Sequence, residues 1–259
     1  TLTVDEQNWN GDWNVATDVG MSYFPSVVNT SSSLGQDRGF RDRYSLDIDF
    51  NINSIFAESA SVKFYSQTTE QSQMTTKEKQ TFGRGPQFGP TSMVAEISNY
   101  HFNQEVTGIS AQLSNSFKTI FGHEHDLVYG FENELIETQR PRSKLNIDAM
   151  SGVTTSIFGA DRFPNKTFPD TEVKRIGIFI NDRINVTDRA TLVMGLRYDS
   201  YDLEPTPDTL FNNSNVSRYD LANIDDSSVS SKVGIMYDLS DNISAYMQYA
   251  EGFRSPDYE

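Results

Sequence analysis

Strict two-residue alternation is the feature that most constrains how this chain can fold. In "ATLVMGLRYDSYDLEP" an apolar side chain stands at every second position, at Leu192, Met194, Leu196 and Tyr198. The other face carries Thr191, Gly195, Arg197 and Asp199. A period of two is typical of a β-strand, because successive side chains point to opposite faces of a sheet. This strand therefore has one apolar face and one polar face.

The same pattern recurs along the chain, in "RIGIFINDRINV", "RYSLDIDFNI", "KVGIMYDL", "HDLVYGFENEL" and "ISAYMQYAEGF". Asp182 breaks the apolar face of the first of these, close to a turn. The second face carries too many charges for the dry core of a β-sandwich, so that alternative is disfavoured. The alternation predicts strands at about 1–8, 39–52, 59–79, 98–117, 125–140, 171–186, 190–205, 228–239 and 243–254.

Short and long connections alternate between these strands. The links at 53–58, 118–124, 187–189 and 240–242 are short, and those at 9–38, 80–97, 141–170 and 206–227 are long and polar. Tight turns on one rim and long loops on the other are typical of outer-membrane barrels. The prediction is an all-β fold, an antiparallel up-and-down transmembrane β-barrel of which about nine strands are present.

Composition excludes several classes of function. The 259 residues contain no cysteine, so a disulfide framework and a thiolate metal site are impossible. With 21 Lys and Arg against 36 Asp and Glu, the formal charge is -15, which argues against nucleic acid as a partner. No apolar run approaches the roughly 18 residues that a membrane helix needs, but barrel strands are shorter and alternate in polarity.

The end of the chain, "YAEGFRSPDYE", resembles the FRAP box of TonB-dependent outer-membrane receptors. Its motif residues are Gly252, Phe253, Arg254, Ser255 and Pro256, with Ser255 at the position where alanine is usual. The stretch "RIGIFINDRINVTDRATLVMGLRYDSY" is similar to the central barrel strands of that family. Ser231 stands where the family pattern has proline.

The resemblance implies a bacterial outer-membrane location and active transport energised through TonB. It also implies that residues 1–259 are a partial barrel domain, with a TonB-contacting plug domain and the C-terminal strands lying outside them. The segments "RDRYSLDIDF", "VKFYSQTTEQSQ" and "RFPNKTFPDTEVKRIGIF" resemble the haemoglobin and haem, or transferrin and lactoferrin, receptor branch. The expected cargo is haem or a haem protein. The alternative is a receptor for a ferric siderophore or another metal chelate. A passive porin is the outside alternative.

Few residues suggest chemistry. His101 lies near the expected external end of a strand and is a candidate ligand contact, although an ordinary exposed histidine fits the pattern too. The run "FGHEHD" lacks a third partner for a metal, so no metal site is predicted. Arg183, Arg197 and Asp199 are expected to belong to the polar wall of the lumen. No set of catalytic residues and no covalently bound cofactor is expected. We therefore predict that the protein is not an enzyme.

Overall fold

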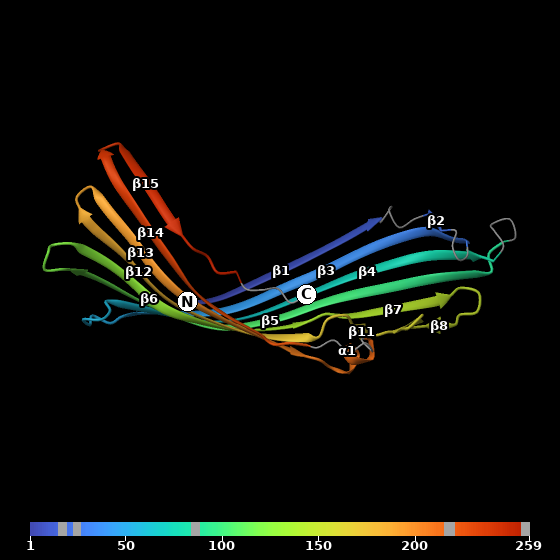
Figure 1. Ribbon diagram of the computed structural model, residues 1–259. Coiled ribbons are helices and arrows are strands. Elements are labelled where there is room, and N and C mark those ends of the chain that lie inside the picture. The colour runs from blue at the N-terminus through green and yellow to red at the C-terminus, as the bar shows by residue number, and fades with distance from the viewer. Residues whose placement is uncertain (15–19, 23–26, 84–88, 215–220, 255–259) are drawn as a thin grey trace.

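One large curved antiparallel sheet forms most of the protein (Figure 1). The computed structural model describes residues 1–14, 20–22, 27–83, 89–214 and 221–254. Hydrogen-bonded neighbours follow the order β1-β3-β4-β5-β6-β12-β13-β14-β15. These strands are β1 (Leu2–Asn14), β3 (Val27–Asn51), β4 (Ser59–Phe82), β5 (Ser92–Lys118), β6 (Glu124–Gln139), β12 (Asp170–Thr187), β13 (Ala190–Thr206), β14 (Ile224–Ser240) and β15 (Ile243–Ala250). The all-β, up-and-down prediction is confirmed.

Smaller elements gather around the long strands. The strand β7 (Pro141–Asp148) follows β6 and pairs with the first half of β5. The other elements are β2 (Gly20–Ser22), β8 (Thr154–Thr155), β9 (Ile157–Phe158), β10 (Asp161–Arg162), β11 (Asn165–Lys166) and the helix α1 (Thr209–Ser214). No helix in the described part of the chain is long and apolar enough to cross a membrane.

The sheet has two different ends. At one end, which we call the turn end, the strands are joined by the short links 52–58, 119–123, 188–189 and 241–242. At the opposite end, the loop end, lie β2, β7, β8, β11 and α1 (Figure 1). The predicted asymmetry of connections is therefore present, and a transmembrane barrel would place the loop end outside the cell.

The predicted strand bounds are too short at the loop end. The strand β1 runs to Asn14, β3 begins at Val27 and β5 begins at Ser92, so much of the expected loops 9–38 and 80–97 is strand. The expected loop 141–170 contains β7 to β11. Both faces are polar in these extensions, so the alternation that reveals a strand is missing, although the backbone ladder continues. At the other extreme, β15 ends at Ala250 and not at 254.

The outer face is defined by the apolar side chains that the register aligns. One row of directly paired positions contains Ile48, Val62, Ala111, Phe131, Ile178, Tyr198 and Val229. Ile178 and Leu196 are each 54% exposed, and many other large apolar residues of this face are also exposed. Exposing so large an apolar surface to water would be energetically unfavourable, whereas contact with the hydrocarbon of a membrane would not be.

The inner face carries polar side chains and glycines. Gly108 lies directly opposite Tyr65, and a Cβ atom at Gly108 would lie 2.4 Å from the tyrosine hydroxyl. Gly177 similarly makes room for Arg197 on the next strand. Because a glycine leaves space above the backbone, a long side chain from a neighbouring strand can lie flat against the wall.

Substitution at Leu196 and Arg197 tests which face meets lipid. In the full-length protein, Leu196→Arg should impair barrel assembly more than Arg197→Leu, because a charge on the lipid face costs about 2–4 kcal/mol near the midplane. The yield of heat-modifiable, folded barrel in outer-membrane fractions measures this. Equal yields from the two variants would contradict the assignment of the faces.

Gly130 tests the close contact between strands. A methyl group there would lie 2.2 Å from the carbonyl oxygen of Ala111 and 3.0 Å from Cζ of Phe179. We expect Gly130→Ala to lower the free energy of unfolding of the full-length protein, measured by urea denaturation, by about 1–3 kcal/mol. Gly234→Ala is the matched control, because its nearest neighbours lie at 3.5 Å. If both variants unfold alike, the predicted clash at Gly130 is wrong.

Candidate functional site on the inner face

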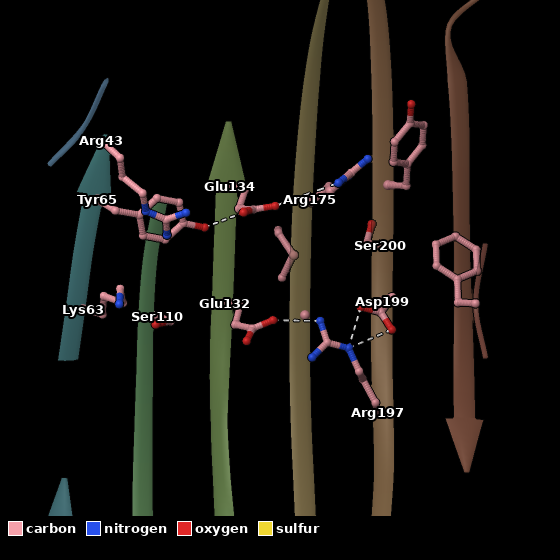
Figure 2. A pocket seen from close by; sticks show the side chains of 14 residues that line it. Arg43, Lys63, Tyr65, Ser110, Glu132, Glu134, Arg175, Arg197, Asp199 and Ser200 are labelled. Carbon is pink, nitrogen blue, oxygen red and sulfur yellow. Dashed lines mark hydrogen bonds and ion pairs between the residues drawn. The ribbon is translucent and has the colours of Figure 1, made fainter. Parts of the chain in front are cut away.

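A polar hollow of about 530 Å³ lies on the inner face, across β3, β4, β5, β6, β12 and β13. Figure 2 shows its labelled side chains projecting from these neighbouring strands. Its charged and aromatic lining residues are Arg43, Lys63, Tyr65, Glu132, Glu134, Arg175, Arg197, Asp199, Tyr201 and Phe253. Opposite charges are therefore interleaved within one wall.

The strand register brings these residues together from distant parts of the sequence. Lys63, Ser110, Glu132, Gly177 and Asp199 occupy one row of directly paired positions. The next row towards the loop end contains Tyr65, Gly108, Glu134, Arg175 and Tyr201. Positions that are paired across an antiparallel sheet have Cβ atoms about 4.5–5.5 Å apart, close enough for side-chain contact.

Arg197 is the most connected residue of the site. Its Nη2 donates to Oε2 of Glu132 at 2.8 Å, and its Nε donates to both carboxylate oxygens of Asp199, at 2.8 and 3.0 Å (Figure 2). The guanidinium thus joins β6 to β13 across β12. Because its donors bind two carboxylates in a fixed geometry, Arg197 can define the shape of the wall here.

A second contact group adjoins Arg197 on the side of the loop end. The Tyr65 hydroxyl donates to Oε1 of Glu134, and the guanidinium of Arg43 lies 4.7 Å from the centre of the Tyr65 ring. Arg175 lies 5.6 Å from the ring of Tyr201 and 4.0 Å from Glu134. These cation–π contacts hold two arginines beside aromatic faces.

A small apolar cluster borders this polar group. Val173, Tyr201 and Leu203 are each at least 93% buried, and Phe253 packs against them. Phe253 belongs to the FRAP-like motif, so the segment after β15 reaches back over the inner face of β12 and β13. The motif therefore contributes to the wall of the hollow.

The rest of the FRAP-like motif is described as far as Arg254, which also makes contacts. Just before Gly252, the carboxylate of Glu251 accepts hydrogen bonds from the backbone N–H and the hydroxyl of Ser231, at 3.0 and 2.7 Å. A proline at position 231 could not donate the first bond. Ser255 and Pro256 lie outside the described residues.

The other predicted residues are distributed over both faces. Arg183 shares the inner face with Arg197 and Asp199, since it lies an even number of residues from Gly177 along β12. His101 lies on the outer face of β5, where it borders a hollow with Arg38 and Glu70. His101 is therefore not part of the inner wall, and a ligand contact for it stays a prediction.

His125, the second histidine of "FGHEHD", provides a partner for Asp182 on the apolar face. His125 Nδ1 lies 2.8 Å from Oδ2 of Asp182, and its ring stacks on Phe117. His123 lies in the turn, where its carbonyl accepts the backbone N–H of Thr119. Among the described residues no group of three or more histidines and carboxylates could hold a metal ion.

The sequence reasoning missed most of the hollow. Tyr65, Glu132, Glu134 and Arg175 share the inner face with Arg197, and each falls on the polar phase of its own strand. That phase was readable from the sequence, but the neighbour across each strand pair was not. Register, and not residue type, was the missing information.

Buried charges also hold the loop end together. Lys166 is 4% exposed, and its Nζ lies 2.7 Å from Asp170 and 2.8 Å from Asp208. Burial lowers the pKa of Lys166, but hydrogen bonds to both carboxylates outweigh burial and raise its pKa overall. For Asp208, burial raises the pKa, but the bonds from Lys166 and the N–H of Phe211 outweigh it and lower the pKa.

A single-layered sheet with an exposed apolar outer face, a charged inner face and all short turns at one end is part of a transmembrane β-barrel wall. The whole chain, residues 1–259, matches the family described as "TonB dependent receptor-like, beta-barrel", and the chain belongs to that family. This family is typically found in the bacterial outer membrane, and its members are transporters.

One solved structure supports the same fold. The copper transporter OprC superposes with a TM-score of 0.52 and 15% identity, over 98% of this chain and 37% of OprC. The siderophore receptor PiuA from Acinetobacter baumannii has a TM-score of 0.44 and 14% identity, over 96% of this chain and 48% of PiuA. The Serratia marcescens hemophore receptor HasR, in complex with HasA and heme, has a TM-score of 0.46 and 11% identity, over 96% of this chain and 45% of HasR.

The chain thus spans less than half the length of each of these structures. No protein with a curated description is similar enough in sequence to count as a match. At these identities the structural likeness concerns the fold alone.

The ion cluster around Lys166 has a defined pH range. Its stabilisation through Asp208, whose pKa is lowered, is present above the usual aspartate value near 3.9 and is lost as the pH falls through the lowered value. Through Lys166, whose pKa is raised, it is present below about 10.4 and is lost as the pH rises through the raised value. In the complete receptor, the protection of α1 against hydrogen exchange, measured relative to the intrinsic exchange rate at each pH, should therefore be high at neutral pH and lower in strong acid.

Asp208→Asn provides the control for this pH dependence. The variant should show lower protection of α1 already at neutral pH and should lose most of the acid dependence of that protection, because position 208 no longer titrates and Lys166 keeps only its contact with Asp170. Exchange in α1 that is equally fast in both proteins at neutral pH would show that the Lys166–Asp208 contact does not hold the helix.

Proposed function

We propose that the complete receptor containing this chain imports an iron-bearing ligand across the outer membrane, with energy relayed through TonB. Haem or a haem protein is the first candidate. The observation that carries the proposal is membership of the TonB-dependent receptor family over the full length of the chain. The charged hollow around Arg197 supports it, because a wall of paired charges suits contact with a polar body inside the lumen.

In this proposal Arg197, Glu132 and Asp199 hold the wall in one shape and present it to the plug domain. Their ion pairs are half exposed to the lumen, with side-chain exposures of 40%, 45% and 19%. A plug could therefore exchange hydrogen bonds with them when it moves, at a modest energy for each pair. The bonds inside the wall would remain when those to the plug break.

The choice of haem rests on sequence resemblance. The segments "RDRYSLDIDF" and "VKFYSQTTEQSQ" form adjoining parts of β3 and β4, so two of the haem-branch segments lie side by side in the sheet. The solved structures similar to this chain are those of a copper transporter, a siderophore receptor and a hemophore receptor with heme. This range of ligands does not separate haem from another metal chelate.

Growth on defined iron sources tests the ligand. Cells lacking their other iron receptors and expressing the complete receptor should grow with haemin or haemoglobin as the sole iron source. Growth should require TonB, so a strain without TonB is the control. Growth on a ferric siderophore alone would replace haem by the second candidate, and TonB-independent diffusion of small solutes would indicate a porin.

A further inference from the structure

Charge is divided between the two faces at the loop end of the sheet. On the outer face, one row of directly paired positions contains Glu6, Asp42, Thr68, Glu105, Glu137, Glu172 and Glu204. Lys174 pairs with Glu172 in this part of the face, and no other ion pair reaches this row among the described residues. An anion approaching the wall from outside the barrel would therefore be repelled.

The inner face of the same region is rich in cations. They are Arg41, Arg43, Lys77, Lys79, Arg140, Arg142 and Lys144, and the inner-face acids of β1, β3, β4, β5 and β7 in this region are fewer: Asp5, Asp37, Glu96 and Asp148. A chain with a formal charge of -15 thus concentrates positive charge on the face that leads into the lumen. Such a distribution attracts anions into the mouth.

Several of these cations are already neutralised. Arg41 lies 3.0 Å from the carboxylate of Asp5, and Lys79 and Lys144 lie 2.9 and 3.0 Å from that of Glu96. Glu96 is 7% exposed, and the bonds from the two lysines lower its pKa despite burial, which acts in the opposite direction. The charges of these residues are committed to ion pairs that join β1 to β3 and join β5 to both β4 and β7.

Arg140 and Arg142 are held in a different way. Arg140 lies 5.6 Å from the ring centre of Phe102 and 5.7 Å from that of Phe168. Arg142 lies 5.4 Å from the ring centre of Phe163, and its Nε donates to the amide oxygen of Asn165 at 2.5 Å. Within the described ranges, neither guanidinium has a carboxylate at ion-pair distance.

These contacts fix two uncompensated charges close together. Arg142 is paired with Tyr100 on the inner face of β5, and Arg140 contacts Phe102 on the same face two residues along. Alternate residues of an extended chain have Cα atoms about 6.6 Å apart, so the two arginines leave the backbone at neighbouring positions of one face, from which they could bind one anion or two linked ones. Tyr100 is 50% exposed and offers a ring face beside them.

We propose that Arg140, Arg142 and Tyr100 form a binding site for anionic iron chelates at the mouth of the receptor. The arginines would bind carboxylates or other oxyanions of the chelate, and Tyr100 would pack against its flat parts. This proposal rests on the proposed uptake function and narrows the ligand to a chelate with anionic groups. Aromatic rings and one amide position the arginines while leaving their charge for the ligand.

Binding to the purified complete receptor in detergent tests the site. The probes are haemin and ferric citrate, which carry anionic groups, and ferrioxamine B, which does not. The double variant R140Q/R142Q should lose at least tenfold in affinity for an anionic probe, whereas R140K/R142K should stay within about threefold of wild type. Added salt should weaken anionic binding to the wild type more than to R140Q/R142Q.

Arg38→Gln is the matched control, because Arg38 also lacks an ion pair among the described residues but lies on the outer face. It should change affinity less than twofold. Heat modifiability on gels verifies that each variant is folded, and Tyr100→Ala supplies a variant that leaves both arginines in place. It should lower the affinity for haemin more than for ferric citrate, since only haemin has a large flat surface.

The outcomes separate this proposal from the proposed function. Equal loss of affinity in R140Q/R142Q and R38Q, or no loss in either, would overturn the anion site. Wild-type receptor that binds ferrioxamine B alone would also overturn it, while leaving iron uptake intact. Binding of ferric citrate and not haemin would reject haem and retain the site. A receptor that binds none of the three probes would refute both proposals.

Discussion

The antiparallel register of the sheet is the constraint on which the rest of this structure depends. Each strand is hydrogen-bonded to its neighbours with little slippage from β1 to β15, and β-bulge irregularities interrupt the long ladders only near their ends. Because side chains alternate, fixing the register also fixes which residues meet on each face. A shift by one residue in β12 would move Arg175 to the lipid side and Ile176 into the lumen.

The same register explains how a single-layered sheet can have one face suited to lipid and another suited to a polar lumen that contains the hollow around Arg197. The lipid side needs only apolar side chains, and near the turn end the polar pair of His125 and Asp182 is hydrogen-bonded, with the histidine ring stacked on Phe117. The lumen side has to hold many charges without a hydrophobic core to cover them. Glycines such as Gly108 solve part of this problem, because they let long side chains lie along the wall and reach partners two strands away.

The sequence alone predicted the strand segments that cross the membrane band, but it did not predict their extensions beyond that band. Alternation predicted the nine long strands of the main path, because lipid and water impose opposite requirements on successive residues. Beyond that band both faces of β3, β4 and β5 meet water, so the extensions look like polar loops although their backbone ladder continues. The hollow around Arg197 needed the register as well, which no local pattern reveals.

The division of charge at the loop end follows from these two facts together. Like charges directly opposite one another destabilise a sheet, yet Glu105, Glu137, Glu172 and Glu204 stand in successive strands. Folding alone does not favour this row. In the proposed anion site, this row would repel anions outside the barrel, and Arg140 and Arg142 would attract them on the inner face. Selectivity at the mouth would then offset the cost of the row in sheet stability. The polar extensions, which lack the alternation that reveals a strand, are the part of the wall that carries both groups of charges.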